Sequence, residues 1–173
     1  MQKREKAVTF KGNPHTLIGP QLKPGDTAPD FACVSSGLEI VNLAKTGNKA
    51  RLFSVDPSLD TPVCSEQTRR FDKELSAFGD KVACYTFSLD LPFAQKRFCS
   101  EAHVGNLQTL SDVHNQSFGK NYGVLIEGLP LPLFSRAIFV VDKNNKITYC
   151  EYVPEVTSHP NYEKAMQALK AAA

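Results

Sequence analysis

Apolar and polar residues alternate near the start of the chain, around Val8 and Phe10. The turn-forming residues Gly12-Asn13-Pro14 come next, and the short apolar run 16–18 follows them directly. A period of two that is broken by turn residues is typical of a β-hairpin, because successive side chains of a strand point to opposite faces. The sequence therefore predicts an N-terminal hairpin within residues 1–20.

Short apolar runs and helical patterns alternate through the rest of the chain. The runs that predict strands lie at 31–34, 38–43, 51–55, 82–89, 107–110, 137–142 and 146–153, and helical patterns begin near 62, 90, 114 and 161. Strands that alternate with helices, followed by a strand pair and a closing helix, are typical of an α/β domain with a mixed sheet. No linker, repeat or low-complexity tract divides residues 1–173, so we expect a single domain.

The pattern around position 64 predicts a helix that begins directly after a loop bounded by prolines. Pro57 ends the strand 51–55, and Pro62 stands where a proline in the first turn sacrifices no intrahelical hydrogen bond. Three apolar residues follow Cys64 at helical spacing and share its face of the helix, namely Phe71, Leu75 and Phe78. We therefore expect Cys64 in the first turn, with its side chain directed inward.

A second helix carries another cysteine. Pro92 indicates its first turn, Asp90 is a plausible N-cap, and the helical pattern continues to about Glu101. Cys99 therefore lies near the end of this predicted helix.

The charge balance is nearly even, with 20 Lys and Arg against 18 Asp and Glu. A net charge of +2 supplies no strong field for polyanions or anionic lipids, so we expect neither nucleic acid nor membrane as a partner. The basic start has no apolar run behind it, and nowhere do about eighteen apolar residues follow one another. We expect a soluble, cytoplasmic protein.

The five cysteines form an odd set that is spread over more than half of the chain. This distribution differs from the dense disulfide framework of a small secreted domain and fits a reducing compartment better. In that setting an unusual cysteine is more often catalytic, redox-active or a metal ligand than a structural crosslink.

The position of Cys64 at a helix start favours a thiolate. Free backbone N–H groups and the helix dipole stabilise an anion there, and such sites lower a cysteine pKa from about 8.5 to roughly 3.5–7.5. Complete ionisation at neutral pH gains only about thirtyfold, so a fast cysteine enzyme must also stabilise charge on the leaving group. For a peroxide, the hydroxyl of Thr61 and the backbone N–H groups of Val63 and Cys64 are candidate donors, and a guanidinium would complete the set.

The segment from Pro57 through Thr61 to Cys64 resembles the active-site signature of the peroxiredoxins. The longer run Pro-Ser-Leu-Asp-Thr-Pro-Val-Cys is similar to that of the bacterial thiol peroxidases, the atypical two-cysteine peroxiredoxin subfamily. Further similar segments extend across nearly the whole chain, at 10–14, 24–31, 90–99, 111–112, 122–124 and 136–142.

This resemblance implies a thioredoxin-like fold with an N-terminal hairpin, usually in a homodimer. It implies that Cys64 is the peroxidatic cysteine, that Cys99 is the resolving cysteine, and that Thr61 and Arg136 assist, with no metal or organic cofactor. Hydrogen peroxide or an organic hydroperoxide would oxidise Cys64 to a sulfenic acid, Cys99 would convert it to an intrachain disulfide, and thioredoxin would restore both thiols. A disulfide needs Cα atoms within about 7 Å, so we expect one of the two helices to loosen during turnover.

Two features depart from the subfamily pattern. Asp56 stands where we expect an apolar residue, and a carboxylate near the sulfur would raise the pKa of the thiol. The loop 127–134, with its Leu-Pro-Leu-Pro run, is also more apolar than expected. Both features bear on pKa and substrate preference and leave the reaction class unchanged.

Plainer interpretations exist for each candidate. A lone cysteine is often inert packing, which is the interpretation that we prefer for Cys33, Cys84 and Cys150. Thr61 is also a possible helix cap, and Arg136 a possible surface ion-pair partner. Three rival functions are considered. A thiol–disulfide oxidoreductase normally uses a Cys-x-x-Cys pair and a zinc module needs closely spaced ligands, and this sequence has neither. The third is a redox sensor, which reacts only once.

Overall fold

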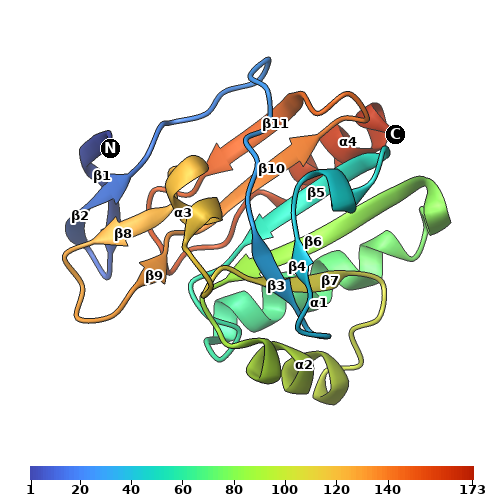
Figure 1. Ribbon diagram of the computed structural model, residues 1–173, viewed down its shortest axis with the longest axis horizontal. Helices are drawn as coiled ribbons and strands as arrows, with labels where there is room; N and C mark the ends of the chain where they lie inside the picture. Colours follow the sequence, from blue (N-terminus) through green and yellow to red (C-terminus); the bar gives the residue numbers. More distant parts are fainter.

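The computed structural model describes residues 1–173, which form eleven strands, four α-helices and two short 3₁₀ helices (Figure 1). The strands are β1 (Lys3–Phe10), β2 (Asn13–Ile18), β3 (Cys33–Ser35), β4 (Ile40–Val41), β5 (Ala50–Val55), β6 (Val82–Ser88), β7 (Gln108–Ser111), β8 (Leu125–Glu127), β9 (Leu133–Phe134), β10 (Ala137–Val141) and β11 (Ile147–Tyr152). The helices are η1 (Ala44–Thr46), α1 (Pro62–Leu75), η2 (Gly79–Lys81), α2 (Pro92–Glu101), α3 (Ser117–Asn121) and α4 (Tyr162–Ala172).

The larger sheet has seven strands in the order β11-β10-β5-β6-β7-β3-β4. Its centre is parallel, because α1 connects β5 to β6 and α2 connects β6 to β7, whereas β10, β11, β3 and β4 run antiparallel to their neighbours. This mixed sheet with flanking helices confirms the predicted α/β, thioredoxin-like fold class.

The predicted N-terminal hairpin consists of β1 and β2, which pair antiparallel. It does not stand alone, because β2 also pairs with β8, and β8 pairs with β9, to give a second sheet of four strands. The hairpin therefore lies beside the segment that leads into β10 (Figure 1).

Side chains alternate between the two faces of the larger sheet and build two cores. On one face, Leu52 packs with residues of α1 and α4, including Phe71 and Leu169. On the other face, Phe53 packs with α3 and the smaller sheet, where Phe118 stacks on Phe87 at 3.8 Å between ring centroids. This burial fixes α1 against the sheet and so fixes the position at which α1 begins.

Several boundaries differ from the sequence predictions. Helix α1 ends at Leu75, so Phe78 lies beyond it and precedes η2. The N-cap prediction for Asp90 is wrong, because Leu91 is the N-cap of α2 and caps it without a side-chain hydrogen bond. The carboxylate of Asp90 instead accepts hydrogen bonds from Ser58 Oγ and the Leu59 N–H, both at 2.8 Å. Asp90 therefore ties the end of β6 to the loop that precedes α1.

None of the helices combines the length and the apolar character that crossing a bilayer requires.

Candidate active site

The central strand β5 delivers Cys64 to the site. It ends at Val55, a loop follows over residues 56–61, and α1 begins at Pro62 as the sequence predicts. Thr61 is the N-cap residue and has an extended backbone, and Pro62 occupies the first turn without loss of a hydrogen bond. The side chain of Cys64 is directed inward and is fully buried.

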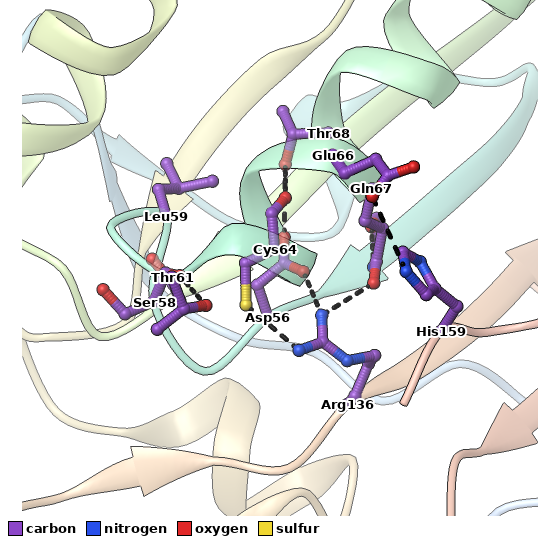
Figure 2. Close-up of polar contacts among 12 residues, drawn as sticks. Asp56, Ser58, Leu59, Thr61, Cys64, Glu66, Gln67, Thr68, Arg136 and His159 are labelled. Carbon is purple, nitrogen blue, oxygen red and sulfur yellow. Dashed lines mark hydrogen bonds and ion pairs between the residues drawn. The ribbon is translucent and has the colours of Figure 1, made fainter. Parts of the chain in front are cut away.

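Arg136, directly before β10, reaches the same place. Ala137 pairs with Val55 in the antiparallel ladder of β10 and β5, so Arg136 and Asp56 lie next to each other just beyond this pair. The guanidinium is 2% exposed. Its Nη2 donates to the sulfur of Cys64 at 3.2 Å, and its Nη1 donates to Asp56 Oδ1 at 3.1 Å (Figure 2). Arg136 is therefore no surface ion-pair partner, and it directs one positive charge at two acidic groups.

Gln67 and Val156 hold the guanidinium in place. Gln67 Oε1 accepts from Arg136 Nη1 at 2.9 Å, and the carbonyl of Val156 accepts from Arg136 Nε at 3.0 Å. Gln67 Nε2 in turn donates to Ser54 Oγ at 2.6 Å. Gln67 is not among the residues that the sequence predicts for the site, although its position three residues after Cys64 puts it on the same side of the helix, where a polar residue on a buried face is a recognisable signal.

Thr61 and Ser58 form the other side of the site. The Thr61 hydroxyl donates to the carbonyl of Ser58 at 2.9 Å and does not cap α1. Hydrogen bonds from Thr61 and from the backbone of Ser58 lower the pKa of the Cys64 thiol. The role of Thr61 beside the sulfur stays a prediction, whereas its alternative role as a side-chain cap is wrong, because the hydroxyl makes no cap hydrogen bond.

A cavity of about 350 Å³ opens over these residues. Pro57, Thr61 and Arg136 contribute to its wall. The remaining lining comes from the hairpin turn, the loop before α1 and its first residues, β9, and the segment after β11, namely Phe10, Lys11, Ser58, Pro62, Val63, Leu133, Val156 and Thr157. The aliphatic and aromatic side chains make one side of the cavity apolar, so a hydrocarbon group fits there.

The electrostatics of Cys64 differ from the sequence prediction. Burial and, after it, the nearby carboxylate of Asp56 raise the pKa of the thiol to about 11, although Arg136, Thr61 and Ser58 act in the opposite direction. The predicted preference for a thiolate is therefore wrong for the buried Cys64 of this structure. The loss of solvent around the sulfur raises the pKa more than the start of the helix lowers it. The prediction that Asp56 raises the pKa of the thiol is confirmed.

Cys99 lies apart from the cavity. It is half-buried near the end of α2, and all five cysteines are free thiols. Burial raises the pKa of Cys99, whereas a hydrogen bond with Thr109 lowers it. The structure therefore brings Cys64, Thr61, Arg136 and Pro57 together and leaves Cys99 outside.

The other cysteines occupy strands. Cys33 and Cys84 are buried as predicted, whereas Cys150 on β11 is half-buried and donates to the carbonyl of Leu22 at 3.3 Å. No three His, Cys, Asp or Glu side chains gather in a way that could hold a metal ion.

The fold and the site together define a class of protein. A cysteine in the first turn of the helix that follows a central strand, with an arginine on its sulfur, is the arrangement of a peroxiredoxin, an enzyme that reduces peroxides with a thiol. The thioredoxin-like sheet that carries this site agrees with the assignment.

Comparisons with known proteins give the family. The Redoxin family model matches residues 23–166. The chain is 52% identical to the thiol peroxidase of Halalkalibacterium halodurans, over 96% of this chain and 98% of the relative, and 49% identical to that of Bacillus subtilis, over 95% and 96%. A peroxiredoxin-like protein from Aquifex aeolicus has a TM-score of 0.90 at 38% identity, over 97% of this chain and 98% of that one. The chain belongs to the Redoxin family, and it is a thiol peroxidase of the peroxiredoxin type.

Proposed function

We propose that Cys64 is the peroxidatic cysteine and that its substrates are hydrogen peroxide and organic hydroperoxides. The observation that carries this proposal is the 3.2 Å contact between Arg136 Nη2 and the sulfur, directly beneath the cavity. The apolar wall formed by Phe10, Leu133 and Val156 supports organic hydroperoxides, because it removes the hydrocarbon group from water.

In the first step, the Cys64 thiolate attacks one oxygen of the peroxide. The S–O bond forms, the O–O bond breaks, and the other oxygen leaves with the electron pair and takes up a proton as water or alcohol. Sulfur is oxidised to a sulfenic acid and the peroxide is reduced. Arg136 stabilises the thiolate and the charge that develops on the oxygens, and Thr61 and the backbone N–H groups of the first turn supply further hydrogen bonds.

In the second step, the thiol of Cys99 attacks the sulfenic sulfur, which gives a Cys64–Cys99 disulfide and releases water. Cys99 lies seven residues along α2 from Pro92, a distance of about 10 Å at the usual helical rise. Cys64 is fully buried in the first turn of α1 and Cys99 lies outside the cavity, so we propose that local unwinding of α1 or α2 brings the two sulfurs together.

We further propose that thioredoxin reduces this disulfide and that the enzyme is a homodimer of single-domain chains. The shared core between the two sheets supports a single domain. Two exposed apolar side chains at the start of α2, Leu91 and Phe93, support an interface that would cover them. The five free thiols support a reducing, cytoplasmic location.

Mass spectrometry of peroxide-treated protein tests the mechanism. We expect one equivalent of hydroperoxide to link the peptides of Cys64 and Cys99, and thioredoxin with its reductase to restore both thiols and sustain peroxide consumption. A protein that reacts once and does not turn over would instead be a redox sensor. Peroxide consumption by a Cys64→Ser variant would disprove the assignment of Cys64.

A further inference from the structure

Asp56 is an acidic group in direct contact with the proposed catalytic arginine. It follows β5, is fully buried, and accepts from Arg136 Nη1 at 3.1 Å through Oδ1. Its Oδ2 accepts from the Thr68 hydroxyl at 3.4 Å, and that hydroxyl also donates to the Cys64 carbonyl at 3.0 Å. The same guanidinium therefore faces both Asp56 and the sulfur of Cys64 (Figure 2).

Two acidic groups thus compete for one buried cation. If Asp56 and Cys64 both ionise, the buried cluster holds two negative charges against the single positive charge of Arg136. If only one of them ionises, the cluster is neutral. Since an unbalanced buried charge is costly, the neutral arrangement with one proton on the pair is favoured.

The surrounding ionisable groups do not change this balance. They are Cys84 on β6, Asp90 directly after β6, Tyr162 at the start of α4, His159 before α4, and Glu66 and the exposed Arg70 on α1. Glu66 and His159 are exposed and lie 3.6 Å apart at the rim. None of these groups is a second buried cation, so Arg136 alone balances the pair.

We propose that Asp56 and Cys64 share a single proton opposite Arg136, and that Asp56 thereby controls how much Cys64 thiolate the reduced enzyme contains. In the reactive form, the proton has moved in net terms from the sulfur to the carboxyl group. The S–H bond is replaced by an O–H bond, the charge of the cluster is unchanged, and Arg136 exchanges one counter-ion for the other. The inference rests on the proposed role of Cys64.

The ionisation behaviour supports this geometry. Burial raises the pKa of Asp56 to about 7, and the charge of Asp56 raises the pKa of Cys64. Two acidic groups that face one buried cation lose their protons in two steps that belong to the pair. Asp56 acts on Cys64 by its charge and through their shared contact with Arg136, so it is a positioning residue whose removal changes the pH at which the sulfur reacts.

An alkylation experiment tests this proposal. Iodoacetamide reacts with the thiolate, and mass spectrometry of the Cys64 peptide gives its rate across a pH series. We expect two ionisation steps in the wild-type protein, and a single step in Asp56→Asn whose midpoint is lower by about one to three pH units. Asp72→Asn is the matched control. Asp72 is a buried carboxylate on α1, the helix that carries Cys64, but it accepts hydrogen bonds from the backbone of 105–107 and does not contact Arg136. It should leave the Cys64 midpoint unchanged.

An unchanged midpoint in folded Asp56→Asn would overturn the proposal. If that variant does not fold, infrared titration of the carboxyl groups in reduced wild-type protein and in Cys64→Ser decides the question. A protonated carboxyl should persist to higher pH in the wild type than in Cys64→Ser, and identical titrations would overturn the proposal. Alkylation needs no peroxide, so the two proposals can fail separately. If the alkylation midpoint shifts in Asp56→Asn but Cys64 does not react with peroxide, the proposed function is refuted and the shared proton is not.

Discussion

The guanidinium of Arg136 donates to the sulfur of Cys64 across 3.2 Å, although 72 residues separate them in the chain. Two structural features produce this contact. Helix α1 begins at the end of β5, and β10 pairs with β5 in a register that opposes Ala137 to Val55. A strand pairing far from the cysteine in sequence therefore decides the charge that faces it.

Replacement of Arg136 should slow the reaction of Cys64 with peroxide. We expect Arg136→Ala to lower the second-order rate constant by about a hundredfold or more, because a buried charge-assisted donor is lost. Stopped-flow kinetics measure this rate. Arg51→Ala is a matched control, because Arg51 is buried like Arg136. It lies on β5 and binds Thr46 and Asp142 at the end of the strand that is remote from Cys64. A loss of less than about threefold in folded Arg136→Ala would return Arg136 to a structural role.

Gln67 should contribute through Arg136. In Gln67→Leu the guanidinium keeps its hydrogen bonds to Asp56 and Cys64 but loses the one to Gln67. We therefore expect the rate of reaction with peroxide to fall about tenfold, which is less than in Arg136→Ala. Gln95→Leu provides the comparison, because Gln95 is a buried glutamine on α2 that binds Ser88. Equal rates in Gln67→Leu and the wild type would show that Val156 alone fixes the guanidinium.

Cys99→Ser should separate the two halves of the cycle. Cys64 should still consume one equivalent of peroxide at a rate close to that of the wild type, whereas turnover with thioredoxin should stop, because no second thiol resolves the sulfenic acid within the chain. Cys84→Ser, which changes a buried cysteine on β6, should keep its turnover. A coupled assay of peroxide consumption measures both variants, and continued turnover in Cys99→Ser would identify another resolving thiol.

Disulfide formation should loosen a helix. Hydrogen exchange of the amides in the first turn of α1 or along α2 should be at least about tenfold faster in the oxidised protein than in the reduced protein, because the proposed disulfide closes by unwinding one of these helices. Helix α4 is the internal reference and should exchange equally in both states. Equal exchange of α1 and α2 in the two states would contradict the proposed unwinding.

Asp56 should make the stability of the protein depend on pH. Burial raises its pKa from 3.8 to about 7. Between about pH 4 and 7 the folded protein therefore keeps a proton that the unfolded chain has released, so the free energy of unfolding falls as the pH rises. Relative to that of Asp56→Asn, the free energy of unfolding of the wild type should fall by on the order of a few kcal/mol from pH 4 to pH 7. Urea titrations at a series of pH values measure the difference, and parallel curves for the two proteins would contradict it.

Local sequence signals determined where the elements begin and which way Cys64 faces. Pro62 in the first turn and the apolar spacing from Cys64 to Phe71 and Leu75 are short-range features, so they fix a helix start and an inward stripe without knowledge of the partners. Similarly, the residues 10–18 define a hairpin through their own turn and alternation. The resemblance carried by the Pro57–Cys64 signature extended this local information to a family.

Only the tertiary structure decided the charge state and the surroundings of the sulfur. The register of β10 brings Arg136 to Cys64, the packing of α1 excludes water from both, and Asp90 bonds the Ser58 loop instead of capping α2. The pKa of a buried thiol depends on desolvation and on charges contributed by distant segments, and neither quantity is encoded in the spacing of residues along one helix. For that reason the sequence predicted that Cys64 stands in the first turn of a helix, while the fold determined that Asp56 and Cys64 face the same cation.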